Sequence, residues 1–241
     1  MASPILLSRL HSDHPPRDSQ VQAQIDVLNQ DYTGTGLSFK LQNVTRTLNA
    51  TWFNNVAPNN TEQTDMKNTL RQGDVSTLNI YTVGFTSGDT RGLLGYSTFP
   101  ADYAADPMND GVVVLYSSLP GGSTANFSLG RSGTHEVGHW VGLYHPFQGG
   151  CDGSGDFVDD TPAEAIPASG CPIGRDTCST PGLDRKQIFS CSCWILVTYL
   201  IIFSAVQNYM DYSNDACMNN FTPGQIARLQ SQISAYRGIN L

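Results

Sequence analysis

The sequence predicts a domain of the mixed α+β or α/β class, and three observations predict it. Residues 18–32 repeat apolar side chains at helical spacing, whereas residues 112–116 form a β-branched run that is typical of a buried strand. Residues 222–236 repeat the helical pattern near the end of the chain. With 241 residues the chain can bury a sizeable core in one large domain or two modest ones.

Helices and strands alternate through the first half of the chain. The helix over residues 18–32 should end at the glycine-containing residues 33–36, and residues 37–41 then alternate apolar and polar side chains as a strand does. A short helix is expected to open at Thr61, and residues 78–83 are typical of a further strand.

The second half is irregular until its end. Gly, Asp, Pro and Cys dominate residues 147–184, which predicts ordered loops held by crosslinks. Thr222 and Gln225 have the spacing of a capping box, with a proline at the first helical position. The apolar face expected for this terminal helix consists of Ile226, Leu229, Ile233 and Tyr236.

Charge and cysteine content exclude one class of function and indicate a compartment. The chain has 13 Lys and Arg against 21 Asp and Glu, so it lacks the clustered cations that a nucleic-acid binder needs. Six cysteines and five glycosylation sequons favour an oxidising, secretory environment and predict a glycoprotein. The sequons begin at Asn43, Asn49, Asn59, Asn126 and Asn220. Residues 1–16 hold too short an apolar run for a signal peptide, so we expect the natural N-terminus to differ.

The chain contains the pattern HExxHxxGxxH, in which each fixed residue has a chemical task. His135 and His139 lie four residues apart, so on a helix both imidazoles project from one face and can share a zinc ion. Gly142 lets the backbone leave the helix, which makes His145 a third ligand. Glu136 can accept a proton from water on the zinc. Three protein ligands leave one coordination position open, which indicates a catalytic rather than a structural site.

Chance is the competing interpretation of this pattern. HExxH alone arises in helices that bind no metal, but the added Gly and third His reduce that chance to roughly a few per cent. His11 and His14 have no such partners and are expected on the surface. The long form of the motif belongs to metzincins, in which a tight turn with a methionine follows, and Met210 supplies one. Tyr212 lies two residues later and can donate to a developing oxyanion.

On these motifs the chain resembles the pappalysin family of metzincin zinc endopeptidases, in particular its secreted fungal branch. The resemblance runs from about Ser19 to Arg237. The matching segments are residues 24–29, 110–118, 134–145, 147–151, 155–162, 170–171, 175–178 and 208–212, with Cys217. The resemblance implies an α+β fold with a twisted mixed sheet and helices in an upper subdomain, about 17–145. A loop-rich lower subdomain, about 146–241, would hold the Met-turn and the terminal helix, and residues 1–16 are unmatched.

The resemblance also assigns roles to single residues. It makes His135, His139 and His145 the zinc ligands, Glu136 the base, Met210 the Met-turn residue and Tyr212 the oxyanion contact. It pairs Cys151 with Cys178 and Cys171 with Cys217. It implies that residues 112–116 form the strand at the cleft edge, against which an extended substrate adds as an antiparallel strand. The resemblance also allows structural calcium in the lower subdomain, but solvated loop acids are at least as good an interpretation of the acidic residues there. The candidate oxygen ligands are Asp156, Asp159, Asp160 and Thr161.

Residues 185–205 depart from the family pattern, which runs Gly-Leu-Asp-Pro and then reaches the Met-turn. A hydropathy window identifies residues 188–206 as a transmembrane helix, but a span here would separate the histidines from Met210 by a bilayer about 30 Å thick. We therefore reject a membrane span. We interpret residues 185–205 as a translated retained intron. Codons at both edges of the segment can hold splice signals, and removing the segment between these signals restores Gly-Leu-Asp-Pro.

The sequence therefore predicts an extracellular, monomeric zinc endopeptidase that cleaves proteins and binds neither nucleic acid nor membrane. One rival is a non-catalytic zinc-binding secreted protein, in which the insertion disrupts the cleft. A second is a membrane-anchored protein. The cleavage preference is not predicted, because the walls of the substrate pockets come from loops without a recognisable pattern.

Overall fold

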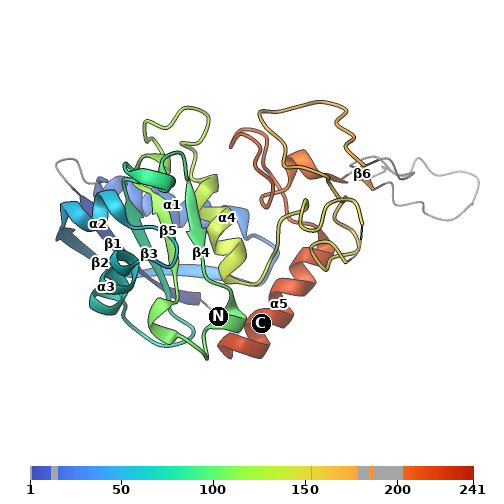
Figure 1. The fold of residues 1–241 in the computed structure, drawn as a ribbon. Helices are drawn as coiled ribbons and strands as arrows, with labels where there is room; N and C mark the ends of the chain where they lie inside the picture. Colours follow the sequence, from blue (N-terminus) through green and yellow to red (C-terminus); the bar gives the residue numbers. More distant parts are fainter. Residues whose placement is uncertain (1, 12–15, 153, 179–184, 187–202) are drawn as a thin grey trace, which may run out of the picture. The chain divides into compact units, whose positions relative to one another are not determined.

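A computed structural model describes residues 2–11, 16–152, 154–178, 185–186 and 203–241 (Figure 1). The chain divides into two compact units. Unit 1 comprises Met1–Gly142 and Leu229–Leu241, and unit 2 comprises Leu143–Arg228. The terminal helix therefore contributes residues to both units.

Unit 1 is built on a five-stranded sheet in the order β2-β1-β3-β5-β4 (Figure 1). The strands are β1 (Ala2–His11), β2 (Ser38–Leu48), β3 (Leu78–Val83), β4 (Gly95–Ser97) and β5 (Val112–Leu115). β1 runs parallel to β2 and β3, and β3 runs parallel to β5, whereas β4 is antiparallel to β5. Every residue of β3 is buried, as expected for a central strand of a sheet covered on both faces.

Helices cover this sheet and confirm the α+β class. They are α1 (Asp18–Asp31), α2 (Ala50–Asn55), α3 (Thr61–Leu70), α4 (Arg131–Trp140) and α5 (Pro223–Arg237). α2 and α3 pack together over one sheet face, where Trp52, Phe53 and Met66 join Tyr81 and Val113 in a buried core. α1 contacts β2, and α4 contacts β4 and β5.

Two strands of the five-stranded sheet have no counterpart in the expectations from sequence. β1 lies in the segment that the sequence left unassigned, and its backbone pairs with both β2 and β3. β4 has only three residues, too few to show a periodicity. The implied placement of residues 112–116 at the edge of the sheet is wrong, because β5 lies between β3 and β4. The edge strand on that side is β4.

The buried stripe of α5 also differs from the expected one. Tyr236 is 47% exposed, whereas Arg237 is 1% exposed. The buried residues of this helix are Gln225, Leu229, Ile233 and Arg237. They are spaced four residues apart, so the stripe keeps helical geometry but ends on a charged side chain. The capping box is present, since Gln225 N donates to Thr222 Oγ1 at 3.1 Å and Thr222 N donates to Gln225 Oε1 at 2.9 Å.

Unit 2 is largely irregular chain with two disulfides. Cys151 is bonded to Cys178 and Cys171 to Cys217, with Cα–Cα distances of 5.5 and 5.8 Å. These are the pairs that the family resemblance implied. Two short strands, β6 (Arg185–Lys186) and β7 (Phe203–Ser204), pair antiparallel. Residues 187–202, which form most of the proposed intron product and of the rejected membrane span, lie outside the described residues.

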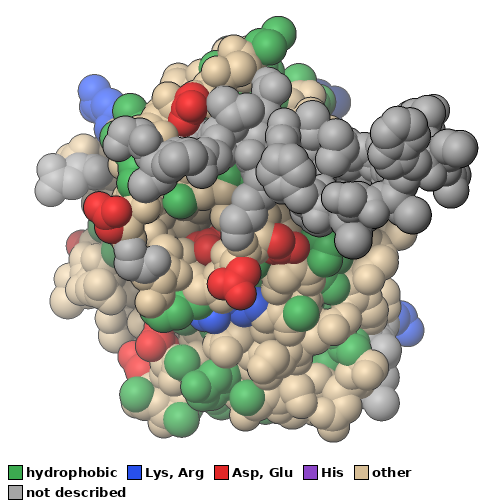
Figure 2. Space-filling model, turned by 90° about the vertical axis from the view of Figure 1, so that its right-hand side faces the viewer, with side chains coloured by type: hydrophobic (Ala, Val, Ile, Leu, Met, Phe, Trp, Pro, Cys, Tyr) green, Lys and Arg blue, Asp and Glu red, His purple; other side chains and the backbone are tan. Residues whose placement is uncertain are grey.

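Acidic side chains are visible on the face of the molecule that Figure 2 draws. Figure 2 shows acidic side chains at several points of one face, with basic side chains scattered singly among them. Among the residues that the structure describes, no helix combines the length and the apolar character that crossing a membrane requires.

Candidate metal centre

Helix α4 carries the first part of the HExxHxxGxxH pattern, and α1 holds the start of this helix. Thr134 Oγ1 donates to Asp31 Oδ2 at 2.6 Å, and Arg131 forms an ion pair with the other oxygen of the same carboxylate. The hydroxyl of Tyr32 donates to the Thr134 carbonyl at 3.1 Å. The residue directly before His135 is therefore fixed through both its side chain and its backbone.

The end of α4 is held from the C-terminal segment of unit 1. Arg237 donates through Nε to the Trp140 carbonyl at 3.0 Å, and through two further nitrogens to Asp110 at 3.0 and 3.2 Å. The indole of Trp140 donates to the same Asp110 carboxylate at 3.1 Å. All three side chains are at most 1% exposed. The last carbonyl groups of a helix have no hydrogen-bond donor within the helix. Here the buried Arg237 donates a hydrogen bond to one of them.

Gly142 makes the turn that leaves α4. Its φ is +101°, in the region that glycine adopts without strain. A Cβ at this position would also lie 2.7 Å from Cβ and Cγ of Gln232, so the packing of α5 leaves no room for a side chain. Both observations explain the glycine in the pattern.

The three histidines of the pattern form a cluster of potential metal ligands. His135 and His139 are 7% exposed, and their rings lie 4.8 Å apart in an edge-to-face arrangement. The ligand nitrogens of these two residues and of His145 all lie within 4.8 Å of one another. Imidazole nitrogens that bind one tetrahedral zinc ion at about 2.1 Å lie roughly 3.4 Å apart, so small side-chain rotations would bring the cluster onto an ion.

Glu136 lies on the same helix but is not a member of this cluster. It is 6% exposed, and its Oε2 is buried without a hydrogen-bond partner. Burial raises the pKa of this carboxyl to about 8. Its neighbour on β4 is Gly95, where a Cβ would lie 2.6 Å from Glu136 Cγ and 2.8 Å from the Val113 carbonyl oxygen. Gly95 was not predictable from the sequence, because a single glycine between short apolar segments carries no signal of its own.

Unit 2 contains Met210 and Tyr212. Met210 is fully buried, and its backbone N–H donates to Asn208 Oδ1 at 2.9 Å. Asp211 accepts from the backbone N–H groups of Ala168 at 3.0 Å and Tyr212 at 2.8 Å. Burial raises the pKa of Asp211 above its ordinary value, while these hydrogen bonds oppose the shift. Side chains on both sides of Met210 therefore fix this turn, whereas Tyr212 is 48% exposed.

Two aromatic residues pack on the third histidine within unit 2. The ring of Phe147 stacks on His145 with centroids 4.5 Å apart and an interplanar angle of 11°. Tyr212 meets His145 edge to face at 5.0 Å. The sequence indicates no role for Phe147 beyond its place in a segment that matches the family, because its ring contacts depend on the fold.

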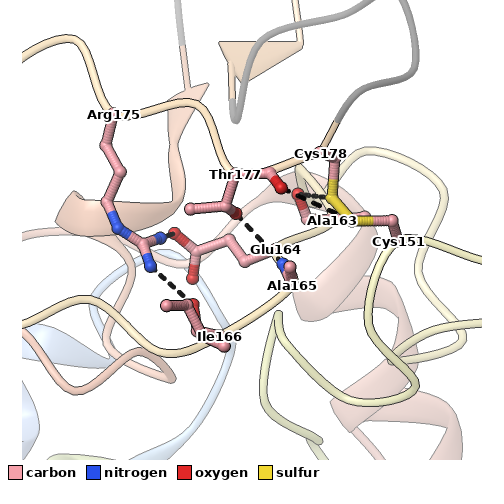
Figure 3. The surroundings of a disulfide bond; sticks show 8 residues. All are labelled: Cys151, Ala163, Glu164, Ala165, Ile166, Arg175, Thr177 and Cys178. Atoms are coloured by element: carbon pink, nitrogen blue, oxygen red, sulfur yellow. Dashed lines mark hydrogen bonds and ion pairs between the residues drawn. A yellow bond between two sulfur atoms is a disulfide. The ribbon is translucent and has the colours of Figure 1, made fainter.

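The disulfide between Cys151 and Cys178 lies beside a buried carboxylate (Figure 3). Glu164 is fully buried and pairs with Arg175, which also donates to the Ile166 carbonyl at 2.7 Å. Ala165 N donates to Thr177 Oγ1 at 3.0 Å, so hydrogen bonds join the same two loop segments as the disulfide.

The candidate calcium ligands are not equivalent. The Asp160 carboxylate accepts from Thr222 Oγ1 at 2.6 Å and Gly224 N at 2.8 Å, so it already caps α5. Asp159 is exposed. Asp156 is 5% exposed, its Oδ2 has no hydrogen-bond partner, and burial raises its pKa to about 6. The other oxygen of Asp156 accepts from the Val158 N–H at 3.1 Å, so Oδ2 is the buried carboxylate oxygen of this loop that lacks a partner.

Comparisons with known proteins agree on one family. A family model described as Pregnancy-associated plasma protein-A matches residues 60–234. An extracellular metalloprotease of Pyricularia oryzae is 44% identical over 222 residues, which cover 91% of this chain and 69% of the relative. Extracellular metalloprotease 1 of Coccidioides posadasii is 42% identical over 233 residues, covering 95% and 74%. Mature mirolysin of Tannerella forsythia, solved with a cleaved peptide, is 28% identical with a TM-score of 0.73, covering 97% of this chain and 91% of that one.

Proposed function

Because this chain belongs to the Pregnancy-associated plasma protein-A family, we propose that it is an extracellular zinc endopeptidase that hydrolyses peptide bonds in proteins. The observation that carries the proposal is the close cluster of His135, His139 and His145 beside a buried, unpartnered Glu136. Three neutral imidazoles suit zinc, and an adjacent carboxylate outside the ligand set suits proton transfer.

The three histidines would hold the zinc ion. When bound there, zinc supplies a Lewis acid that polarises the scissile carbonyl and makes water more acidic. Glu136 takes the proton of the attacking water on its unpartnered oxygen and passes it to the leaving amine. Tyr212 donates its hydroxyl proton in a hydrogen bond to the oxyanion that develops on the substrate. Met210, fully buried in its turn, supports the site through packing.

An extended peptide would bind along β4. This strand pairs with β5 on one side and forms the edge of the sheet on the other. A free strand edge offers backbone N–H and C=O groups to an added strand, a recognition mode that depends little on substrate sequence. Glu136 packs beside Gly95 on this strand, which would bring the scissile bond near the base.

Glycosylation is proposed at the sequons whose asparagines are exposed to solvent. Asn43, Asn59 and Asn126 are exposed. The side chain of Asn49 instead caps α2 by accepting from Trp52 N at 3.0 Å, so it is the poorer acceptor of a glycan. We also expect a monomer that binds neither nucleic acid nor membranes, in keeping with the net charge of −8.

Calcium binding is proposed at Asp156. Its buried Oδ2, which has no hydrogen-bond partner, would coordinate the cation. The bound cation would stabilise the ionised carboxylate.

The proposed catalysis is tested with Glu136→Gln in the full chain, using casein as substrate with and without a zinc chelator. We expect the wild type to cleave casein and to lose this activity with the chelator. The variant should retain bound zinc, measured by metal analysis, and lose cleavage. A wild type that holds zinc but cleaves nothing would favour the rival non-catalytic zinc-binding protein. Undiminished turnover by the variant would refute the role of Glu136.

A further inference from the structure

Phe147 contacts two residues to which the proposed function gives separate tasks. Its ring stacks on His145 at 4.5 Å and meets the ring of Tyr212 at 4.9 Å with an interplanar angle of 69°. The rings of His145 and Tyr212 also meet each other at 5.0 Å. The three rings therefore form a closed triangle in which each touches the other two.

A tight turn places the ring of Phe147 over His145. The Gln148 N–H donates to the His145 carbonyl at 2.9 Å, which closes a four-residue turn with Pro146 and Phe147 at its centre. Proline presets the backbone angle at the first central position of such a turn. The Gly150 N–H then donates to the Phe147 carbonyl at 3.1 Å, so a second turn follows directly. The local sequence thus fixes the backbone on both sides of Phe147.

The stacked geometry suits a metal-binding histidine. The nitrogen lone pairs and N–H groups of an imidazole lie in the plane of its ring, so a neighbour on the ring face leaves both nitrogens open. Rings at an interplanar angle of 11° restrain that plane from tilting without occupying either nitrogen. His145 needs such restraint more than the other two histidines, because it follows the end of α4 at Trp140 and lies in a turn.

Tyr212 is held in a complementary way. Its backbone N–H is fixed by Asp211, but its side chain is 48% exposed, so ring contacts contribute to its orientation. Phe147 and His145 both meet this ring at steep angles, 69° and 79°. A change in the ring of Phe147 would therefore disturb the tyrosine and the histidine together.

We propose that Phe147 is a positioning residue that sets the ring orientations of His145 and Tyr212 jointly, and so couples zinc binding to oxyanion stabilisation. The inference rests on the proposed function for the roles of these two residues. Phe147 touches neither substrate nor metal in this scheme. Partners that orient a metal ligand typically change metal affinity 10- to 100-fold when they are replaced, which sets the size of the expected effect.

The test compares Phe147→Leu, Phe147→Tyr and Phe221→Leu in the full chain. Phe221 lies in the same unit, and its ring packs on Tyr209 at 4.9 Å, so its replacement removes an aromatic contact elsewhere. Zinc affinity of the metal-free protein is measured by competition with a chromophoric chelator. kcat and KM are measured separately on a peptide substrate, and Tm by circular dichroism.

We expect Phe147→Leu to weaken zinc binding at least about tenfold and to lower kcat at saturating zinc, with KM nearly unchanged. Phe147→Tyr keeps the ring and should stay within about twofold of wild type in both quantities. Phe221→Leu should lower Tm and leave zinc affinity and kcat unaltered. Phe147→Met serves as a second variant if the leucine variant does not fold.

The inference is overturned if Phe147→Leu binds zinc and turns over substrate as the wild type does. Equal losses of zinc affinity in Phe147→Leu and Phe221→Leu would also overturn it, because they would show a general effect of stability. The proposed function fails in a different way. If the wild type shows no cleavage that a chelator abolishes, the proposed function is wrong, but the zinc affinities of the variants still test the effect of Phe147 on His145.

Discussion

The guanidinium of Arg237 lies 3.6 Å from the centroid of the Trp140 ring, and its Nε donates to the Trp140 carbonyl at 3.0 Å. Trp140 directly follows His139 and ends α4, the helix that carries two candidate ligands. Arg237, the last residue of α5, therefore contacts the C-terminal end of this helix. The same guanidinium pairs with Asp110, just before β5. Three segments distant in sequence thus meet at one buried ion pair.

Replacing Arg237 with Met should destabilise the protein strongly. The change leaves Asp110 buried and without its closest cation, and breaking a buried pair by removing one partner costs about 3–5 kcal/mol. Urea unfolding measures the free energy of unfolding. The double variant Asp110→Asn/Arg237→Met removes the orphaned charge and should recover part of the loss. A single variant as stable as wild type would show that the pair contributes nothing to the fold.

The helix that carries two of the candidate metal ligands was predictable because its signal is local. HExxHxxGxxH lies within one helix and the turn after it, so spacing alone indicates which side chains converge. Arg237 gave no such signal, since its burial depends on Asp110, which lies 127 residues away. Apolar patterning therefore favoured Tyr236, which is 47% exposed. β4 escaped prediction for a related reason: its three residues form a strand only because β5 supplies their partners.

Gly95→Ala should impair catalysis more than it impairs folding. The added Cβ would lie 2.6 Å from Glu136 Cγ, so the side chain of the proposed base must move. We expect kcat to fall at least about tenfold, since a displaced general base loses most of a contribution of 10²–10⁴. Zinc content should remain, because the three histidines are untouched. kcat on a peptide substrate and bound zinc are the two measurements.

Gly84→Ala is the matched control for this variant. A Cβ at Gly84 would lie 2.3 Å from the ring of Phe53, in the core that α2 and α3 form with the sheet. This change should lower Tm and leave kcat unaltered below the melting temperature. If both alanine variants lose kcat alike, the clash with Glu136 is not the cause.

We expect calcium bound at Asp156 to stabilise the protein to an extent that depends on pH. Burial raises its pKa to about 6, above the ordinary value of 3.8. Between these pH values the folded state binds more protons than the unfolded state, so this group lowers the free energy of unfolding as pH rises. At pH 7 the carboxylate is ionised, and bound calcium would offset that loss. We expect 5 mM calcium, about the concentration that saturates a weak extracellular site, to raise Tm at pH 7 and to have little effect at pH 5.

Asp156→Asn should remove this calcium response, measured as Tm by circular dichroism. Asp176→Asn is the control, since Asp176 is an exposed acid of the same unit. A calcium response that survives Asp156→Asn would place the cation elsewhere, and no response in the wild type at pH 7 would leave these residues as solvated loop acids.

The pairing of β6 with β7 bears on residues 185–205. Arg185 is the antiparallel partner of Ser204, so the chain leaves and returns at nearly the same point. Paired Cα atoms in antiparallel strands are about 4.5–5.5 Å apart, little more than one residue step of 3.8 Å. Replacing residues 185–205 by a single proline, as the splicing hypothesis requires, should therefore join Asp184 to Val206 without moving the Met-turn.

The shortened protein should be soluble, and it should cleave casein at least as fast as the full chain. A shortened protein that folds but has lost the full chain's activity would show that the segment belongs to the working enzyme. Sequencing the gene decides the origin of the segment independently, since an intron requires GT and AG at its two edges.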